Sequence, residues 1–229
     1  MPGLLGPRDP AQPLLTLLDG PARVELSGST TANWVAKTAN LLVDGHDAPD
    51  RVGILLPLHW QSVCFLLGAA ATGATVVVGR VPAELSGCPV CFTTPGRASS
   101  VLDAGADDVL VVSGSPMGTP VPDLAPGLLD AAREVPGYGD HFPGRPAGAF
   151  EAGGLAVEPA PDLGLTPADR VLTILGLADG LPLLLATLAA GAGLVLVPDA
   201  GSLPLPDAAA AERVTATVGV NVPGLRRIG

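Results

Sequence analysis

Two stretches of the chain share one pattern of apolar and polar positions. The first, "DRVGILLPLHW", begins at Asp50, and the second, "DRVLTILGLADG", begins at Asp169. In each copy a polar Asp-Arg pair precedes an apolar run of strand length, and a longer apolar segment, a Gly-Ala step and a β-branched run follow. Uninterrupted apolar runs are typical of strands covered on both faces of a parallel sheet. The repetition therefore predicts two related α/β halves.

Each copy predicts a strand, a helix and a second strand. In the first copy the strand covers 52–56 and stops at Pro57, the helix covers 60–71, and the second strand covers 75–78. A unit of this kind requires parallel pairing of its strands and a right-handed crossover. The second copy repeats the order with a strand at 171–175, a helix at 181–190 and a strand at 194–197.

Further periodic segments extend these two units. A helix over 33–43, capped by a threonine, follows a short strand or hairpin at 22–26. Strands and helices then alternate, as in an α/β sheet. The other predicted segments are the strands 89–94, 108–112 and 215–220, the helices 98–104, 128–134 and 207–214, and an edge strand at "GLAVEP".

The middle of the chain differs in composition from both halves because it is rich in proline and glycine. Long irregular stretches inside a compact domain usually carry function or are disordered. We predict a first α/β subdomain at 1–115, a connector at 116–162 and a second α/β subdomain at 163–229, and the two subdomains are able to pack as one compact domain. The predicted fold class is α/β, with two related subdomains of mostly parallel sheets flanked by helices.

Charge and hydropathy argue against several partners. The formal net charge is -10, Lys37 is the single lysine, and the densest basic spot is Arg226-Arg227. Nucleic-acid binding needs a basic stripe that neutralises phosphates, so neither nucleic acid nor an anionic membrane surface is expected. The proline-broken N-terminus lacks the basic region of a secretory signal. The apolar stretch 181–198 is split by glycines into a helix and a strand, so we expect a cytoplasmic protein and no membrane span.

Two of the three cysteines, Cys88 and Cys91, have C-x-x-C spacing, while Cys64 stands alone. The spacing is compatible with a redox dithiol or with half of a zinc site. Zinc needs two further ligands, and the three histidines are isolated, so no metal site is predicted. The residues after Gly87 look extended, which would place the two thiols about 10 Å apart on opposite faces, too far for a disulfide. The favoured interpretation is two buried apolar side chains in a core strand.

The order of these segments resembles a known superfamily. The stretch from "ELSGSTTANWVAKTANLL" through "DRVGILLPLHWQSVCFLLGAAATGATVV", the strands "CFTT" and "DDVLVVS", and the later "DRVLTILGLADGLPLLLATLAAGAGLVLVP" and "AERVTATVGVNVPGL" resemble the N-terminal domain of adenylate-forming (AMP-binding, acyl-CoA synthetase-like) enzymes. The resemblance covers most of the chain in the order of its segments and in their pattern of apolar and polar residues. It implies the fold of that domain and a reaction that couples a carboxylate to AMP with ATP and Mg²⁺.

The residues that this reaction requires have no counterpart in the chain. The resemblance implies a Ser/Thr/Gly-rich phosphate loop ending near a lysine, before the second "DRV" strand. The residues there are "RPAGAFEAGGLAVEPAPDLG", which lack the hydroxyls and the lysine and contain Glu151 and Glu158. Ala178 or Asp179 stands where the family has a histidine, and the family's later catalytic parts, including its C-terminal lysine, would begin where this chain ends, at Gly229. No catalytic residue is therefore predicted.

One cleft remains as a candidate site. Ligands of α/β sheets favour the carboxyl ends of the strands, and the two "DRV" strands end at "PLHW" and "GLADG". If the halves face each other, His59, Trp60 and Asp179 line one cleft between them. In the alternative interpretation Trp60 packs the start of a helix, His59 is a solvated loop residue and Asp179 caps the second helix.

These observations favour a non-catalytic remnant of an adenylate-forming enzyme that acts as a binding or protein-interaction module. No cofactor is predicted, and a homodimer or a protein partner is expected to cover exposed sheet edges and apolar faces. The alternative is a ligase-like protein that still binds ATP, AMP or an acyl ligand and is completed by another chain. A third hypothesis, a new enzyme that uses the connector as a lid, is supported by no residue.

Overall fold

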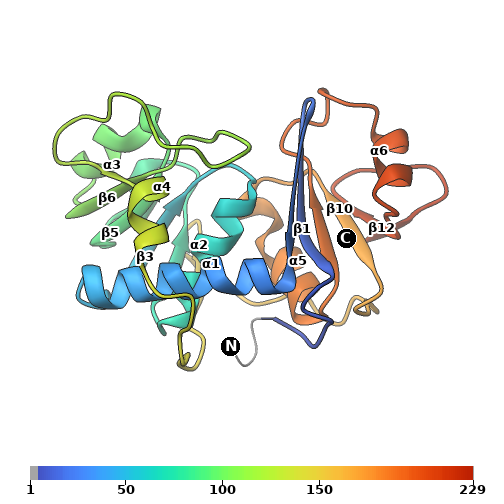
Figure 1. The fold of residues 1–229 in the computed structure, drawn as a ribbon, viewed down its shortest axis with the longest axis horizontal. Coiled ribbons are helices and arrows are strands. Elements are labelled where there is room, and N and C mark those ends of the chain that lie inside the picture. Colours follow the sequence, from blue (N-terminus) through green and yellow to red (C-terminus); the bar gives the residue numbers. More distant parts are fainter. Residues whose placement is uncertain (1–4, 229) are drawn as a thin grey trace. The chain divides into compact units, whose positions relative to one another are not determined.

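The computed structural model describes residues 5–228, which form two compact units. Of these residues, unit 1 comprises Ala32–Pro57 and Gln61–Val157, and unit 2 comprises 5–31, Leu58–Trp60 and 158–228. Each unit is built around its own hydrogen-bonded sheet with helices beside it (Figure 1). The predicted fold class is therefore confirmed.

The sheet of unit 1 has seven strands, and all neighbours are parallel except the last pair, β8 and β9. The repeated "DRV" strand β3 lies near its centre, between β4 and β5. In spatial order the strands are β7 (Leu129–Asp130), β6 (Asp108–Val111), β5 (Val90–Thr93), β3 (Arg51–Leu55), β4 (Thr75–Val78), β8 (Phe150–Ala152) and β9 (Leu155–Val157).

Helices cover this sheet because its strands are apolar on both faces. Helix α2 (Trp60–Ala71) is buried along its whole length. Helix α1 (Gly28–Asn40), extended by the π-turn Leu41–Gly45, approaches it so closely that a Cβ at Gly68 would lie 2.5 Å from the Cβ of Thr38. Helix α3 (Ala98–Asp103) packs against β5 and β6 (Figure 1). Short helical segments complete the unit: α4 (Ala131–Glu134) and the 3-10 turns Pro82–Leu85, Pro95–Arg97 and Val135–Gly137.

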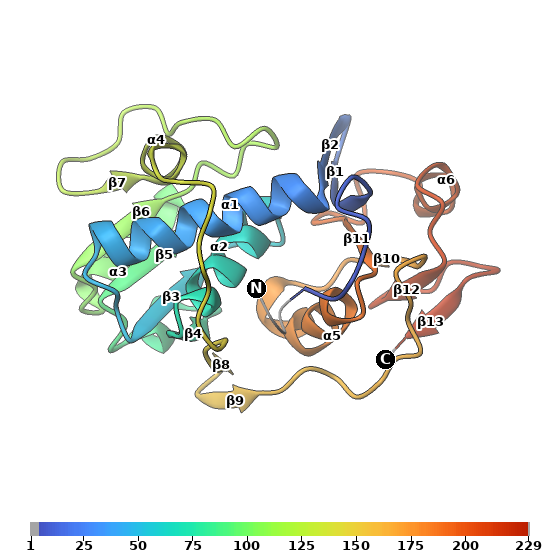
Figure 2. The same cartoon turned by 60° about the horizontal axis from the view of Figure 1, so that its bottom comes forward.

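The sheet of unit 2 has six strands, again parallel except for one terminal pair, β1 and β2. Its "DRV" strand β10 lies between β11 and β12. Helix α5 (Leu177–Ala189) packs against β11, and α6 (Leu205–Ala211) precedes β12 (Figure 2). In spatial order the strands are β13 (Arg226–Ile228), β12 (Ala216–Val218), β10 (Arg170–Thr173), β11 (Gly193–Leu196), β1 (Pro13–Asp19) and β2 (Ala22–Ser27).

The two sheets follow one scheme. From β6 to β9 in unit 1 and from β13 to β2 in unit 2, five adjacent strands are parallel and an antiparallel hairpin partner closes the series. Within this scheme β3 corresponds to β10, β4 to β11 and β5 to β12, as the repeated sequence predicts. The hairpin comes last in the sequence of unit 1 and first in the sequence of unit 2.

Several elements differ from the prediction: β8 and β13 were not predicted, the predicted helix 128–134 begins as strand β7, and α1 starts at Gly28 instead of residue 33. The strand β1 was not predicted; its apolar run "LLTLL" lies next to β11, far away in sequence. Helix α5 begins at Leu177, before the predicted start, because Gly176 takes an extended backbone and the amide of Gly180 donates to its carbonyl at 2.8 Å.

The observed division of the chain also differs from the predicted boundaries. The first strand pair belongs to unit 2, because β1 pairs with β11. Most of the predicted connector belongs to unit 1, where Lys37 Nζ donates to the carbonyl of Tyr138 at 2.6 Å and Asn40 Nδ2 donates to that of Gly139 at 2.8 Å. Over residues 5–228, no helix is both long enough and apolar enough to cross a membrane.

Candidate functional site

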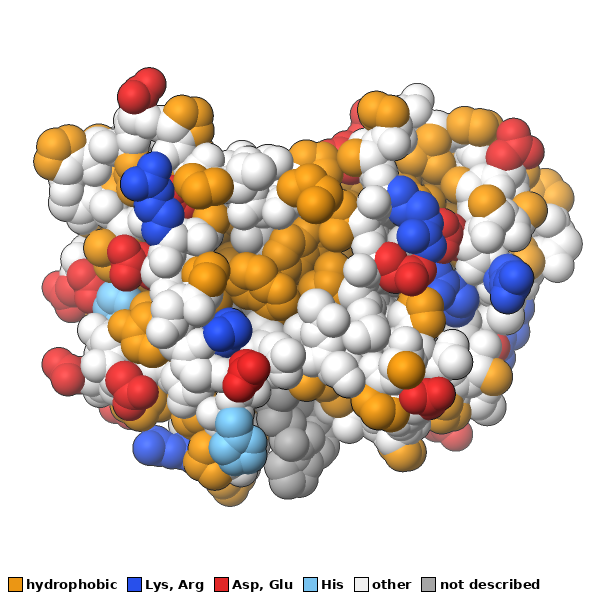
Figure 3. Space-filling model, viewed as in Figure 1, with side chains coloured by type: hydrophobic (Ala, Val, Ile, Leu, Met, Phe, Trp, Pro, Cys, Tyr) orange, Lys and Arg blue, Asp and Glu red, His pale blue; other side chains and the backbone are white. Residues whose placement is uncertain are grey.

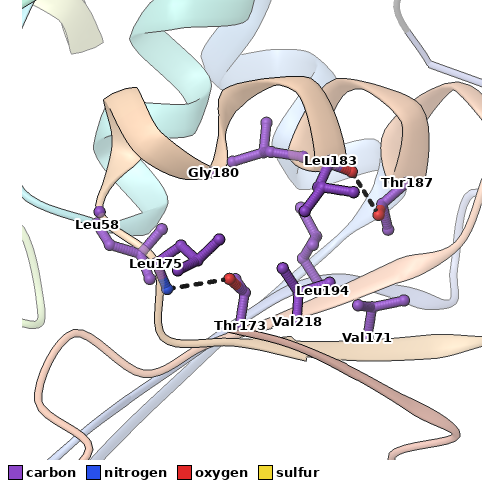
Figure 4. A pocket seen from close by; sticks show the side chains of 11 residues that line it. Leu58, Val171, Thr173, Leu175, Gly180, Leu183, Thr187, Leu194 and Val218 are labelled. Carbon is purple, nitrogen blue, oxygen red and sulfur yellow. Dashed lines mark hydrogen bonds between the residues drawn. The ribbon is translucent and has the colours of Figure 1, made fainter. Parts of the chain in front are cut away.

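The carboxyl end of β10 borders a small enclosed cavity in unit 2 (Figure 4). The strand leaves the sheet after Thr173, and the chain turns at Gly176 into α5, so strand end and helix start enclose the space from two sides. The side chain of Leu58 also lines this cavity. The lining residues are Leu58, Val171, Thr173, Leu175, Gly176, Gly180, Leu183, Leu184, Thr187, Leu194 and Val218.

The cavity is apolar and very small. Its two hydroxyl groups are already engaged: Thr173 Oγ1 accepts from the amide of Leu175 at 3.2 Å, and Thr187 Oγ1 donates to the carbonyl of Leu183 at 2.7 Å (Figure 4). The volume of the cavity is about 10 Å³, roughly the minimum for one water molecule. In this conformation the cavity has no room for an acyl group or a nucleotide.

The three residues of the predicted cleft all belong to unit 2. His59 and Trp60 are each 4% exposed, and their ring centroids lie 5.5 Å apart. Asp179 is exposed in the first turn of α5, and its Oδ2 lies 3.7 Å from the position a Cβ would take on Gly176. The alternative interpretation of His59 as a solvated loop residue was wrong, because the ring is buried. A ligand-binding role for the three residues stays a prediction.

The segment that the family resemblance assigns to phosphate binding forms a tight β-hairpin in unit 1. Strands β8 and β9 pair directly, with Ala152 opposite Leu155, and only Gly153 and Gly154 form the turn. Their φ angles are +59° and +76°, the left-handed values that a two-residue hairpin turn needs and that glycine adopts without strain. All amides from Phe150 to Val157 thus belong to a hairpin and its turn, and none of these residues carries a hydroxyl or an amine.

The arginine of the first "DRV" copy pairs with Glu151 of this hairpin. Arg51 Nη2 lies 2.8 Å from Glu151 Oε2, and Nη1 lies 3.2 Å from Oε1. The hydrogen bonds from Arg51 lower the pKa of Glu151 despite the desolvation of that carboxyl. The negative charge noted in the sequence at this place is therefore balanced within unit 1.

The arginine of the second "DRV" copy takes part in a similar but more buried network. Glu212 accepts from Arg23 Nε at 2.6 Å and from Arg170 Nη2 at 2.8 Å, and its side chain is only 7% exposed. The bonds from Arg23, followed by the nearby charges of Arg23 and Arg170, lower the pKa of Glu212 against the opposing effect of burial. In each unit the arginine at the start of the "DRV" strand thus pairs with a glutamate that is distant in sequence.

An open hollow lies at the opposite end of β10, beside Arg170. Its lining includes Arg8, Asp9, Gln12 and Asp169, and its volume is about 370 Å³. Arg8 donates to the carbonyls of Gly191 at 2.9 Å and Pro13 at 2.6 Å. Burial and then the charge of Arg170 lower the pKa of Arg8. Two arginines and two aspartates thus line this hollow beside apolar residues, and its volume is large enough for a small anion.

The sequence analysis singled out Asp169, Arg170 and the strand ends "PLHW" and "GLADG", which contribute to these spaces, but it did not single out Thr173, Thr187 or Arg8. Thr173 and Thr187 interrupt apolar runs, and this is the only signal that distinguishes them in the sequence. Arg8 lies in a segment without periodicity, so its approach to Arg170 depends on the pairing of β1 with β11. Among residues 5–228, no group of three or more His, Cys, Asp or Glu side chains is placed to hold a metal ion.

The chain matches no protein-family model. It is 38% identical over 225 residues to a TIGR03089 family protein of Mycobacterium tuberculosis (strain ATCC 25618 / H37Rv). This match covers 90% of the chain and 91% of that relative.

Solved structures of acyl-CoA synthetases share the fold. An acyl-CoA synthetase of Brucella canis is 18% identical with a TM-score of 0.72, and the match covers 91% of this chain and 45% of the synthetase. The inhibitor-bound N-terminal domain of FACL13 from Mycobacterium tuberculosis is 16% identical with a TM-score of 0.68, over 92% of this chain and 59% of that domain structure. The chain therefore spans about half the length of these proteins, and at this identity the likeness shows the fold alone.

Proposed function

The chain belongs to the TIGR03089 family, and from that premise we propose that it is a non-catalytic relative of the adenylate-forming enzymes that acts as a binding or protein-interaction module. The fold of acyl-CoA synthetase N-terminal domains supports the relationship. The chemistry of the site supports the lack of catalysis.

The hairpin at the predicted place of the phosphate loop carries this proposal. A loop that holds a triphosphate presents several backbone amides and hydroxyls to the ligand and usually adds a lysine. Here the amides belong to a hairpin closed by Gly153 and Gly154. The single lysine of the chain, Lys37, instead donates to the carbonyls of Pro136 and Tyr138. The cavity at the end of β10 adds support, because it has room for about one water.

The test is ATP–pyrophosphate exchange with the purified chain and a panel of carboxylic acids. We expect no exchange above the rate without protein for any acid. An active acyl-CoA synthetase in the same assay serves as the positive control. Acid-dependent exchange by the chain alone would overturn the proposal.

The second part of the proposal is a homodimer formed through β9. This strand ends its sheet and carries no charge, and Leu155 on it is 73% exposed. The other edge strands with several residues, β2 and β13, carry Arg23, Glu25, Arg226 and Arg227, which discourage edge-to-edge pairing. A second copy of β9 in antiparallel orientation offers the same unpaired backbone groups across a two-fold axis, as an isologous interface requires.

Light scattering across micromolar concentrations tests the dimer. We expect a dimer for the natural chain and a monomer for Leu155→Lys, which places a charge on the paired edge. Met117→Lys is the matched control, because Met117 is 69% exposed in a loop of the same unit and should leave the dimer intact. A monomeric natural chain, or equal effects of both substitutions, would contradict pairing through β9.

A second candidate function is binding of a nucleotide or acyl ligand that another chain completes. The hollow beside Arg8 and Arg170 favours it, since guanidinium groups recognise phosphates and carboxylates. Calorimetric titration with ATP, AMP and an acyl-CoA should show binding that weakens in Arg8→Gln. Exchange activity that appears only after addition of cell extract would favour this candidate over the first. Absence of heat in every titration would remove it.

A further inference from the structure

The two cysteines of the C-x-x-C motif lie together in unit 1. Strand β5 begins at Val90, so Cys88 precedes it, in the turn after the exposed Gly87. The extended conformation that was predicted to separate the thiols does not include Cys88. The Cys91 thiol donates to the carbonyl oxygen of Cys88 at 3.5 Å, and the two thiols lie close enough for each to shift the pKa of the other. The prediction that both side chains are buried is confirmed, whereas the prediction that both lie in one strand with separated thiols was wrong, because Cys88 precedes β5.

A glycine in the neighbouring strand makes room for the pair. Gly53 of β3 lies opposite Cys91, and a Cβ on Gly53 would lie 2.6 Å from Cys91 Sγ. Glycine inside a strand often marks a site where another group approaches the backbone closely. In the second copy Leu172 takes the place of Gly53, and its partner is Thr217. The thiol pair is therefore specific to unit 1 and is no part of the repeated scheme.

Arg51 gives the pair an electrostatic asymmetry. Its guanidinium pairs with Glu151 and lies close enough to Cys88 for its charge to act on that thiol. The hydrogen bond from Cys91, followed by the charge of Arg51, holds the pKa of Cys88 below its ordinary value. The same contact and burial raise the pKa of Cys91. Of the two thiols, Cys88 is thus the one that gives up its proton more readily.

The third cysteine has a different environment, although all three are buried. Cys64 lies inside α2, and its pKa is raised by desolvation alone. Cys88 directly follows Ser86 and Gly87, which are exposed, and a Cβ on Gly87 would meet no atom within 4 Å. A small opening of this turn exposes Cys88 to a solute, whereas Cys64 requires opening of a fully buried helix.

From this geometry we propose that Cys88 and Cys91 form a redox-active dithiol that reacts with hydroperoxides. The Cys88 thiolate attacks one oxygen of hydrogen peroxide, the O–O bond breaks, and the hydroxide released takes up a proton to give water. Cys88 is then a sulfenic acid. The Cys91 sulfur attacks this sulfenic sulfur, the S–O bond breaks, and the Cys91 proton leaves with the hydroxyl as a second water. Two thiols are oxidised to one disulfide and one peroxide is reduced.

The direct test is mass spectrometry of the native chain after treatment with millimolar hydrogen peroxide. We expect the loss of two hydrogen atoms, a peptide in which Cys88 is linked to Cys91, and recovery of both thiols with a reductant. Cys64 should remain a free thiol. Two free thiols at Cys88 and Cys91 after treatment, or oxidation of Cys64 at an equal rate, would overturn the proposal.

Two variants separate the roles of the partners. Cys91→Ser removes the resolving thiol, so Cys88 should stop as a sulfenic acid that dimedone traps, whereas Cys88→Ser should give no adduct. Cys64→Ser should form the disulfide as the natural chain does. Dimedone labelling of Cys91 in the Cys88→Ser variant, or no labelling of Cys88 in Cys91→Ser, contradicts the assigned roles.

Arg51 is a positioning residue in this scheme, and the repeat supplies its control. Arg51→Gln should shift the pH profile of the peroxide reaction toward higher pH and slow the reaction at neutral pH, because the charge of Arg51 lowers the pKa of Cys88. Arg51→Lys keeps the charge and should restore much of the rate. Arg170→Gln changes the matching arginine of unit 2 and should leave rate and profile unchanged. An unshifted profile in Arg51→Gln, or the same slowing in Arg170→Gln, refutes the role of Arg51.

Discussion

Units 1 and 2 use one arrangement of strands for two different interiors. In both, a "DRV" strand lies beside two parallel neighbours, and its arginine pairs with a glutamate from a distant part of the unit. At the centre of the sheet, however, unit 1 places Gly53 opposite Cys91, and unit 2 places Leu172 opposite Thr217. The same strand order therefore accommodates a glycine beside a larger side chain in unit 1 and a leucine beside a smaller one in unit 2.

The ion pairs differ in the same way. Glu212 in unit 2 is 7% exposed at its side chain and has two arginine partners, whereas Glu151 in unit 1 is 28% exposed and has one. The hairpins also differ, since β2 carries charged residues at its edge and β9 carries none. Unit 2 thus buries its charges and protects its edge, while unit 1 keeps a thiol pair and an unprotected edge.

Leu172→Ala should produce the largest loss of stability. Leu172 is completely buried in a cluster with Val195 and Val214, and its truncation leaves a cavity. Such substitutions cost about 2–5 kcal/mol. Urea denaturation followed by circular dichroism measures the loss. Leu102→Ala is the control, because Leu102 is 38% exposed in α3 and should change the free energy of unfolding by less than about 0.5 kcal/mol. Equal losses of unfolding free energy in the two variants would show that Leu172 is not packed in a core.

Gly53→Ala should be the next most damaging change. The new Cβ would lie 2.6 Å from Cys91 Sγ and 3.1 Å from Leu85 Cδ1, and overpacking of this kind costs about 1–3 kcal/mol. The double variant Gly53→Ala/Cys91→Ala removes the sulfur and should recover part of the loss. A thermodynamic cycle of the four chains measures the coupling. Strict additivity would show that Gly53 is not kept small by Cys91.

Removal of the buried carboxylate should affect stability more than removal of the exposed one. We expect Glu212→Gln to cost about 1–2 kcal/mol, because three charged hydrogen bonds in a buried site are weakened, and Glu151→Gln to cost less than about 1 kcal/mol. Urea titrations at neutral pH compare the two variants. A larger loss of unfolding free energy from Glu151→Gln than from Glu212→Gln would contradict the expectation that the buried carboxylate contributes more.

The same carboxylates give the stability of the chain a dependence on pH. The pKa of each is lowered in the folded chain, so their contributions are present above the unfolded value of about 4.3 and are lost as the pH falls through the folded values. The natural chain should therefore lose more stability between neutral pH and pH ~3 than the Glu212→Gln variant. A natural chain and variant with parallel pH curves would contradict this linkage.

A further small effect is expected at the turn of the β8–β9 hairpin. Gly154 has a φ of +76°, a conformation that costs a residue with a Cβ roughly 1–2 kcal/mol. Gly154→Ala should lower the free energy of unfolding by about 1 kcal/mol, and Gly154→Asn by less, because asparagine tolerates this region. Gly96→Ala is the matched control, since Gly96 has ordinary φ and open space around its Cα. Equal losses from Gly154→Ala and Gly96→Ala would show that the turn does not require glycine.

The repeated pattern was sufficient to predict the centres of both sheets. Apolar runs of strand length after Asp50 and Asp169 gave β3 and β10, and the helix predicted at 60–71 is α2. Local periodicity identifies these segments because each is buried against its sequence neighbours. The pattern also predicted an edge strand at "GLAVEP", which is β9.

Features that depend on distant pairing were not predictable in this way. The strand β1 belongs to a unit whose other central strands follow residue 169, and no local signal reveals this. The approach of Cys88 to Cys91 depends on the turn at Gly87, where φ is +80°. His59 was interpreted as either a cleft residue or a solvated loop residue, and the fold buries its ring next to Trp60.

The position of β1 and β2 also sets an order of assembly during synthesis. All strands of unit 1 lie between Arg51 and Val157, so this unit is complete when the ribosome has passed that point. The β1–β2 hairpin emerges first, but Leu15 has to wait for its partner Leu194 near the other end of the chain. An isolated two-stranded hairpin is marginally stable in water. The apolar strand β1 therefore lacks its parallel neighbour until β11 has been synthesised.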